Sequence, residues 1–415
     1  MVSLRAIGLG LLFVFAVLTM TVYAQEAAET PLKKVYKSVE SLPQKVYGHQ
    51  INAKAVLDSD ETWTPDNVYL VFGPFSTGKF TLTIQAGTVV LFNDDQLRKV
   101  SPPHGSLSVE EGGAVKILGT AEKHVVLAPF DAEDLFWDGI STGFGYKEFT
   151  IEHTDFYKSG AGAGAGAIAT LHSDKEPAVR LKNVTFHELQ NKGFRLWNET
   201  GLSTDSSVTI FGYTPKVTDP QYQYPVMNVD PVAAGTLTKE NFVVKEGVPV
   251  HARVIYVSTP MLNKSVTYRD LGMPYRVDEL QVPGDTYGGP PVTLTLEPGV
   301  VMQVGSIIYV GGKTGTGESD MGNIVAVGTK EKPIRFTSAK DQPKAGDWQS
   351  IFMRAGSFDP KVSKFEYCII EYGGSVPANA VWHDVDQRGN VGSLIAIMNP
   401  PRSEPYDGPQ IAHTT

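Results

Sequence analysis

The chain contains an internal repeat, and this repeat constrains its fold more than any other feature. The segment Thr81–Val90, TLTIQAGTVV, returns 212 residues later as Thr293–Met302, TLTLEPGVVM. Three further blocks follow in the same order, with shifts of 209, 211 and 214 residues: Gly119–Leu127 with Gly328–Phe336, Trp137–Ile140 with Trp348–Ile351, and Ile151–Gly160 with Phe365–Gly374. Ordered blocks at a nearly constant shift indicate a repeat architecture in which only the loop lengths have changed.

The pattern of apolar residues predicts an all-β chain. Apolar and polar residues alternate in short bursts, such as Leu82/Ile84, Leu107/Val109 and Val125/Leu127, with Gly, Asn, Asp or Pro between the bursts. This is the pattern of strands and turns. Only Ala27–Leu42 could hold a short helix. The bursts recur in steps of roughly twenty residues, which favours a solenoid in which strand stacks on strand.

Several blocks resemble one known family of exported bacterial proteins. GTAEKHVVL and GTKEKPIRF resemble the recurring GT-x-E-K-P-I-x-F coil of right-handed parallel β-helix proteins, the pectin-lyase-like superfamily. TLTIQAG and TLTLEPG, the WDGI block and FEYCIIEYGG resemble further strands of that family in the expected order. The resemblance implies a right-handed parallel β-helix and an exported protein, of a subtype to which no activity is assigned.

The repeat and the resemblance together divide the chain into segments. We expect a first β-helix module at 56–200, an irregular β-rich linker at 201–290 and a second module at 291–415. The second module resembles an incomplete copy, because Gly408–Thr415 runs parallel to Pro177–Thr185 and the sequence then stops. This gives the interpretation of a fragment of a longer protein.

The N-terminus predicts export. Arg5 precedes the apolar run Ile7–Val22, and Val22-Tyr23-Ala24 ends it with small outer residues, as in a secretory signal peptide of residues 1–24. A polar lead at 25–55 would follow, and no transmembrane anchor would remain after cleavage. We therefore expect a secreted or cell-envelope protein. The single cysteine, Cys368, cannot form an internal disulfide, and we expect it to be buried.

The charge balance excludes one class of partner. The chain carries 36 basic and 45 acidic residues, a formal net charge of −9, and no basic cluster. Such a balance argues against nucleic acid as a partner. Polysaccharides and cell-surface proteins remain possible partners.

Catalytic residues are sought among those that the two copies do not share, because one active site rarely needs duplication. Asp138 and Asp155 are carboxylates near strand positions one coil apart, where the second copy has Gln349 and Ile369. Glycoside hydrolysis needs two carboxylates roughly 5–9 Å apart across one sugar ring. A polysaccharide lyase would also need a basic residue as proton acceptor, for which Arg180 is the candidate.

Metal sites are not predicted. The acidic clusters at Asn93–Asp95 and Asp131–Asp134 have the oxygen ligands that calcium prefers, but their spacing matches no dedicated calcium loop. Calcium is therefore a possible cofactor only in the enzyme interpretation. His153, His172 and His187 recur about one coil apart, but no pattern places them on one face.

Exposed aromatic residues are the feature that favours binding. Tyr213, Tyr222 and Tyr224 lie in or near a Pro-containing segment, and such rings stack on sugars or anchor protein partners. Our interpretation is an exported, non-catalytic scaffold or binding platform for glycan or protein partners. The alternatives are a polysaccharide lyase or glycoside hydrolase acting in the groove of the first module, and a structural spacer or piece of an adhesin.

Overall fold

The structure is a computed structural model of the chain, and it describes most residues from 30 onward. The described ranges are 30–49, 53–93, 104–131, 136–161, 166–170, 178–190, 193–197, 199–214, 225–258, 260–283, 291–311, 321–354, 356–375, 395–398 and 409–415. The predicted signal peptide, Tyr222 and Tyr224 lie outside these ranges. None of the described helices has the length and apolar character needed to cross a membrane.

The strands form three sheets, and every strand pair among the described residues is parallel. The 11-stranded sheet holds β1 (Gln44–Gly48), β2 (Glu61–Trp63), β3 (Val68–Phe72), β5 (Thr81–Gln85), β6 (Val89–Asn93), β8 (Ala114–Leu118), β9 (Val125–Pro129), β11 (Glu148–Tyr157), β13 (Arg180–Gln190), β15 (Val208–Thr214) and β17 (Phe242–Val244).

The 13-stranded sheet holds β4 (Pro74–Ser76), β7 (Ser106–Val109), β10 (Gly139–Thr142), β12 (Ile168–Thr170), β14 (Phe194–Leu196), β16 (Met227–Val229), β18 (Ile255–Val257), β20 (Tyr275–Val282), β22 (Val301–Val310), β24 (Ile334–Ser338), β25 (Ile351–Arg354), β27 (Cys368–Ile370) and β28 (Ile395–Met398). The third sheet holds β19 (Val266–Tyr268), β21 (Val292–Leu296), β23 (Gly322–Val327), β26 (Lys364–Glu366) and β29 (Gln410–Ala412).

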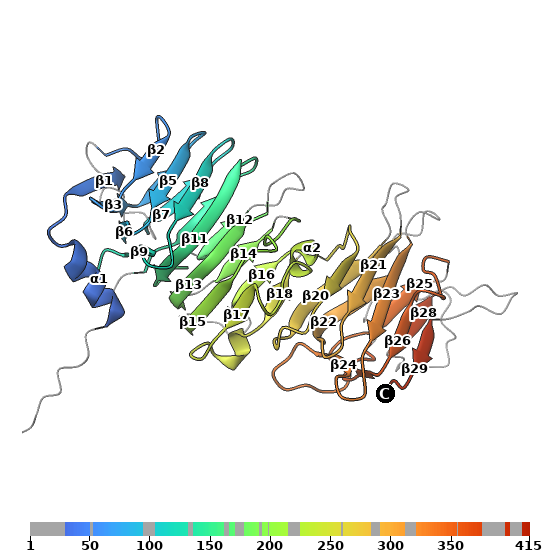
Figure 1. The fold of residues 1–415 in the computed structure, drawn as a ribbon. Coiled ribbons are helices and arrows are strands. Elements are labelled where there is room, and N and C mark those ends of the chain that lie inside the picture. Colours follow the sequence, from blue (N-terminus) through green and yellow to red (C-terminus); the bar gives the residue numbers. More distant parts are fainter. Residues whose placement is uncertain are drawn as a thin grey trace, which may run out of the picture.

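The prediction of an all-β parallel β-helix is confirmed. Neighbours within a sheet are separated in sequence by a whole coil, as in the parallel pairing of β9 with β11 and of β11 with β13. The strands stack along one long axis, from the N-terminal coils to the C-terminal ones (Figure 1). The segment 201–290, predicted as a β-rich linker, adds β15 and β17 to one long sheet and β16, β18 and β20 to the other, so the stack continues through it.

One continuous apolar core fills the interior of the coils, from Tyr47 to Ile370. Large aromatic side chains stack from coil to coil in this core. The indole of Trp137 lies between Phe92, at 3.9 Å between ring centroids, and Phe156, at 5.8 Å. Cys368 is buried as expected, and desolvation raises the pKa of its thiol to about 12.

The two copies of the repeat have the same local geometry. The indole N–H of Trp137 donates to the carbonyl of Tyr157 at 2.8 Å, and that of Trp348 donates to the carbonyl of Glu371 at 2.9 Å. His153 and Tyr367 both turn a corner with positive φ, +42° and +49°. The matched tryptophans and the matched aromatic corner residues are therefore scaffold, as the repeat predicts.

Relative to the first copy, the second copy is rotated about the long axis of the stack by one face of the coil. Strand β9 and its repeat equivalent β24 lie in different sheets: β9 in the 11-stranded sheet and β24 in the 13-stranded one. The same holds for the second half of β11 and its equivalent β27. A face of the first copy is thus continued by a different face of the second copy.

A short helix covers part of the outer surface of the first copy. Helix α1 (Pro31–Val39) lies within Ala27–Leu42, and Thr30 caps it by accepting from the backbone N–H of Lys33 at 3.3 Å. Leu32 and Val39 are buried against the outward side chains of β3, β6 and β9, and the hydroxyl of Tyr36 donates to the carbonyl of Pro129 at 2.5 Å. Helix α1 thereby seals the apolar outer face of these coils (Figure 1).

The stacked tryptophan gives a test of the core. We expect Trp137→Ala to lower the free energy of unfolding by about 3–5 kcal/mol, because it leaves a cavity between two stacked rings and an unpaired carbonyl. Denaturant unfolding measures this change. Phe144, which is 59% exposed, is the control, and Phe144→Ala should stay within about 0.5 kcal/mol of the parent. Similar losses for the two variants would contradict the stacked core.

Candidate functional site

Asp155 is the predicted site residue with the most specific surroundings. It lies on β11 with 20% of its side chain exposed, and its two carboxylate oxygens meet two imidazoles. His124 Nδ1 lies 2.8 Å from Oδ2, and His187 Nε2 lies 3.1 Å from Oδ1. An ionised carboxylate can only accept, so both ring nitrogens donate. We call His124, Asp155 and His187 the histidine–aspartate cluster.

The electrostatics of this cluster favour an ionised Asp155. Desolvation by burial acts to raise the pKa of Asp155, but the hydrogen bonds from His187 and His124 outweigh it and hold the pKa below its usual value. Repeat equivalents of Asp155 and His124 are Ile369 and Pro333, so the cluster belongs to the first copy alone. Among the described residues, no group of three or more His, Cys, Asp or Glu side chains is arranged to hold a metal ion.

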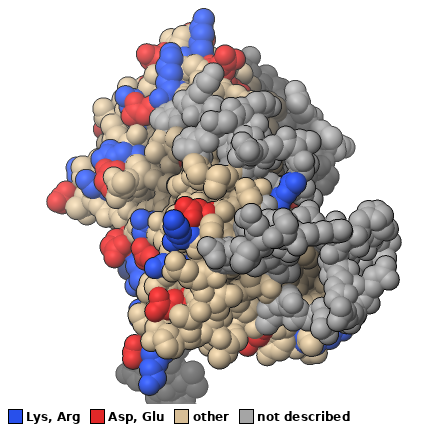
Figure 2. All heavy atoms as spheres, turned by 90° about the vertical axis from the view of Figure 1, so that its right-hand side faces the viewer, with Lys and Arg blue, Asp and Glu red and all other residues tan. Residues whose placement is uncertain are grey.

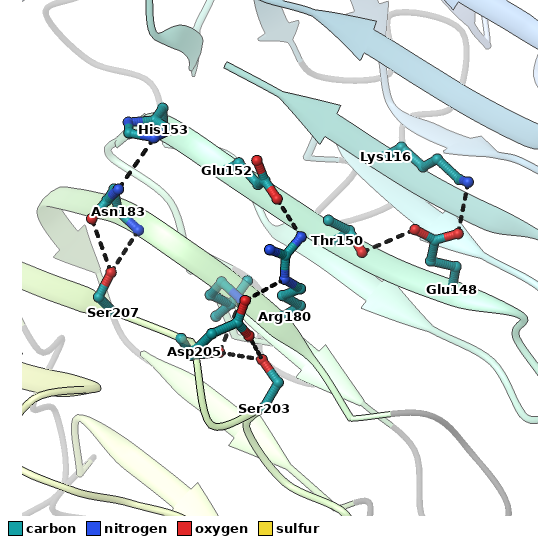
Figure 3. A network of polar contacts seen from close by, with 12 residues as sticks. Lys116, Glu148, Thr150, Glu152, His153, Arg180, Asn183, Ser203, Asp205 and Ser207 are labelled. Atoms are coloured by element: carbon teal, nitrogen blue, oxygen red, sulfur yellow. Dashed lines mark hydrogen bonds and ion pairs between the residues drawn. The ribbon is translucent and has the colours of Figure 1, made fainter. Parts of the chain in front are cut away.

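Arg180 lies in a separate network of charged and polar groups. Its guanidinium pairs with Glu152 through Nη1 and with Asp205 at 2.7 Å through Nε (Figure 3). In the strand register Arg180 pairs with Thr150, whereas Asp155 pairs with Thr185, five positions further along β13. The corner between them is held by Asn183, which bonds to His153 and Ser207.

The predicted catalytic constellation is therefore not assembled. Asp138 directly precedes β10 in the 13-stranded sheet, whereas Asp155 lies on β11 in the 11-stranded sheet, so the two carboxylates do not share a face. Arg180 is held by two carboxylates away from both. Spacing in sequence had suggested adjacency, but adjacent coils place these residues on different sheets.

Of the three predicted aromatic binding residues, Tyr213 lies within the described ranges. Tyr213 is only 3% exposed and belongs to the core. The backbone of β15 turns at Gly212, which has positive φ, so that Phe211 points outward and Tyr213 points inward. Tyr213 is not the exposed ring that a binding role requires. Phe211 instead is 43% exposed. The ring of Phe211 follows those of Tyr157 and His187 in one stack, and we call these three residues the aromatic column.

A second array of outward side chains was not predicted from the sequence. Six residues on consecutive strands of the 13-stranded sheet are paired in register and point out of the coil. We call them the polar column: Arg195, Asn228, Tyr256, Arg276, Gln303 and Thr337. They extend from β14 to β24 and so cross from the first copy into the second.

Side-chain contacts order this column. The Arg195 guanidinium lies 3.3 Å from the ring centroid of Trp197, whose indole N–H donates to Asn228 at 3.2 Å. The hydroxyl of Tyr256 donates to Asp278 at 2.5 Å, and Nε of Arg276 donates to Gln303 at 2.9 Å. Each planar group is thus held in place by a neighbour on the same or the next coil.

Partial burial marks the two arginines of the column. Desolvation lowers the pKa of both Arg195 and Arg276 from its ordinary value, although both remain charged at neutral pH. Burial also raises the pKa of Tyr256, with Asp278 adding to the effect. Partly dehydrated guanidinium groups gain more from a ligand hydrogen bond than fully hydrated ones do.

The two copies of the repeat carry different side chains on the outer face that holds the polar column. Gln303 and Thr337 are the repeat equivalents of Leu91 and Ala128, which α1 covers. Tyr275 stacks on Tyr268 as Tyr69 stacks on Trp63, which makes Arg276 the equivalent of Leu70. The same outer face is therefore apolar and covered in the first copy but polar in the second.

This difference is the sequence signal that could have located the polar column. It becomes visible only when the outward positions of the two copies are aligned, and the alignment of Leu70 with Arg276 needs the structure because their flanking sequences diverge.

Comparison of the chain with protein-family models, with curated proteins and with solved structures found no match. The resemblance to the pectin-lyase-like superfamily therefore remains a prediction, and the class of protein defined here is an all-β protein with long parallel sheets.

The histidine–aspartate cluster makes a prediction for stability. We expect Asp155→Asn to lower the free energy of unfolding at pH 7 by about 1–3 kcal/mol, because two hydrogen bonds to a charged acceptor are weakened. The folded pKa of Asp155 lies below its unfolded value of about 4, so this stabilisation is present above that value. It is lost as the pH falls through the folded pKa.

Unfolding of the parent and the variant from pH 7 down to pH 3 measures this effect. The difference in stability should shrink on acidification below about pH 4. Asp66→Asn, at an exposed turn position, is the control and should show little difference at any pH. A difference that is constant with pH would contradict the cluster.

Proposed function

We propose that this protein is an exported, non-catalytic β-helix protein of the pectin-lyase-like type that binds an extended glycan along the polar column. The observation that carries the proposal is that Arg276, Gln303 and Thr337 replace the apolar, helix-covered Leu70, Leu91 and Ala128 of the first copy, and that they continue in register the row of Arg195, Asn228 and Tyr256. Contact with water requires only that surface side chains are polar. The hydrogen bonds from Trp197 to Asn228 and from Tyr256 to Asp278 also fix the orientation of these side chains, which solvation does not require.

The chemistry of the column suits sugars. Glycan sites combine aromatic rings with a few oriented donors and acceptors. The column supplies Tyr256 with amide and guanidinium groups, and its contacts Trp197 and Asp278 add a second ring and a carboxylate. Neighbouring strands lie about 4.8 Å apart, which is close to the advance of one sugar unit in an extended chain. Ordered side chains also lower the entropy cost of binding.

The charges favour a neutral or weakly acidic glycan. The charge of Arg276 is offset in part by Asp341 and Asp278, and further along the sheet Arg335 pairs with Glu371 at 2.6 Å. On the part of the C-terminal end that is not drawn in grey, basic and acidic side chains are interspersed and form no single patch (Figure 2). A strongly anionic polymer would be attracted by a continuous basic surface.

The enzyme alternative, a polysaccharide lyase or glycoside hydrolase, has less support. Its candidate residues Asp138, Asp155 and Arg180 lie on different sheets or in different networks. The binding proposal needs no such constellation. Location in the cell envelope or outside the cell follows from the predicted signal peptide and belongs to the same proposal.

A panel of neutral and acidic polysaccharides, with and without calcium, tests this proposal. We expect retained complex without new chain ends. Trp197→Ala and Arg276→Met should each weaken binding about tenfold or more, equivalent to about 1.4 kcal/mol, because they remove a ring and a fixed donor. Arg180→Met, on the other long sheet, is the matched control and should bind like the parent.

Three outcomes would count against the proposal. Absence of binding across the panel, or binding that survives both column variants, would remove the polar column as the site. New chain ends would show catalysis and move attention to Asp138, Asp155 and Arg180. Denaturant unfolding of each variant separates a binding loss from a folding loss.

A further inference from the structure

The aromatic column continues the surface that α1 covers. On the outer face of the 11-stranded sheet, Leu70, Leu91 and Ala128 are paired in register beneath α1. Tyr157, His187 and Phe211 are paired in register on the next three strands. Strands β9 and β11 join the two series, since Leu127 pairs with Phe156 directly before Ala128 and Tyr157.

At the junction of the two series, the sheet already packs against α1. The ring of Tyr157 packs against the cluster that α1 forms with the sheet. Beyond it the stack continues, with 4.4 Å between the ring centroids of Tyr157 and His187 and 6.0 Å between those of His187 and Phe211. Because these rings stack face to face, they present their edges outward, and Phe211 keeps 43% of its surface exposed.

The outward positions next to these two series also change, from apolar to polar side chains. Under α1 they are Val68, Val89 and Val126, and beyond it they become Asp155, Thr185 and Thr209. The surface past α1 is therefore a strip of rings with a polar, acidic border. The border includes Asp155, whose charge is stabilised by the two histidines, and the exposed Glu188 lies on the next strand.

Helix α1 shows which chemistry this surface accepts. Its apolar residues Leu32, Val35, Tyr36 and Val39 follow the i, i+3, i+4, i+7 spacing of an amphipathic helix, and they face the sheet. Its exposed residues include Lys33, Lys34 and Lys37. A second helix of this kind, laid beside α1, would place its apolar stripe on the rings and keep its lysines in solvent, where the negative charge of Asp155 attracts them over a longer distance.

We propose that the aromatic column is the docking site for an amphipathic helix of a partner protein, with an apolar stripe and basic flanks like those of α1. Stacked rings that present their edges offer apolar area, which suits aliphatic side chains better than a sugar that needs an open ring face. This site lies on the 11-stranded sheet, so it is independent of the glycan proposed for the 13-stranded sheet.

A labelled peptide of residues 28–42 serves as the probe, because it carries the required stripe and lysines. We expect it to bind the full chain saturably with one peptide per chain while α1 stays in place. Phe211→Ser should weaken this binding about tenfold or more, and Asp155→Asn should reduce its dependence on salt. Phe144→Ser removes a more exposed ring elsewhere and should leave binding unchanged.

Further variants separate the alternatives. If the peptide only exchanges with the resident α1, then Leu91→Ser will weaken binding while Phe211→Ser will not, and the proposal is overturned. A glycan complex lost in Phe211→Ser would assign the column to sugar instead. A dimer of the protein alone that dissociates in Phe211→Ser would make a second copy the occupant. Absence of saturable peptide binding would also overturn the proposal.

Discussion

Register between parallel strands is the constraint on which this structure depends. Each coil pairs with the next through backbone hydrogen bonds, and side chains alternate in and out along each strand. Residues some twenty to thirty positions apart in sequence thereby become neighbours in columns that are either buried or exposed. The core residues Phe156, Phe186 and Ile210 form one such column, and the polar column is another. A slip of one residue in any strand would exchange the two kinds.

The architecture could be predicted from the sequence because it depends on repetition and alternation, which are local signals. The repeat blocks paired His153 with Tyr367 and Trp137 with Trp348, which the structure shows to be shared corners and shared buried indoles, and the alternation indicated the strands. Sheet assignment could not be predicted, because it depends on where each corner turns. Asp138 and Asp155 were therefore expected on one face, and they lie on two.

The same limit explains the errors in the candidate sites. Tyr213 looked exposed because its segment is rich in aromatic and polar residues, but a single positive-φ glycine before it turns its ring inward and leaves Phe211 outside. The histidine–aspartate cluster was also hidden, since His124, Asp155 and His187 come from three coils. The polar column crosses from one copy to the other, and no comparison of matched blocks alone would reveal it.

The outer faces of the two copies differ in the side chains that they carry and in the helix that covers one of them. An internal repeat is what duplication of a gene segment leaves behind, and among the described residues the strands recur in both copies whereas helix α1 packs on the first copy. The matching face of the second copy has the same kind of strand backbone, but its outward side chains are polar. Substitution of its outward residues could proceed without disturbing the coil, so duplication supplied a new surface for selection to act on.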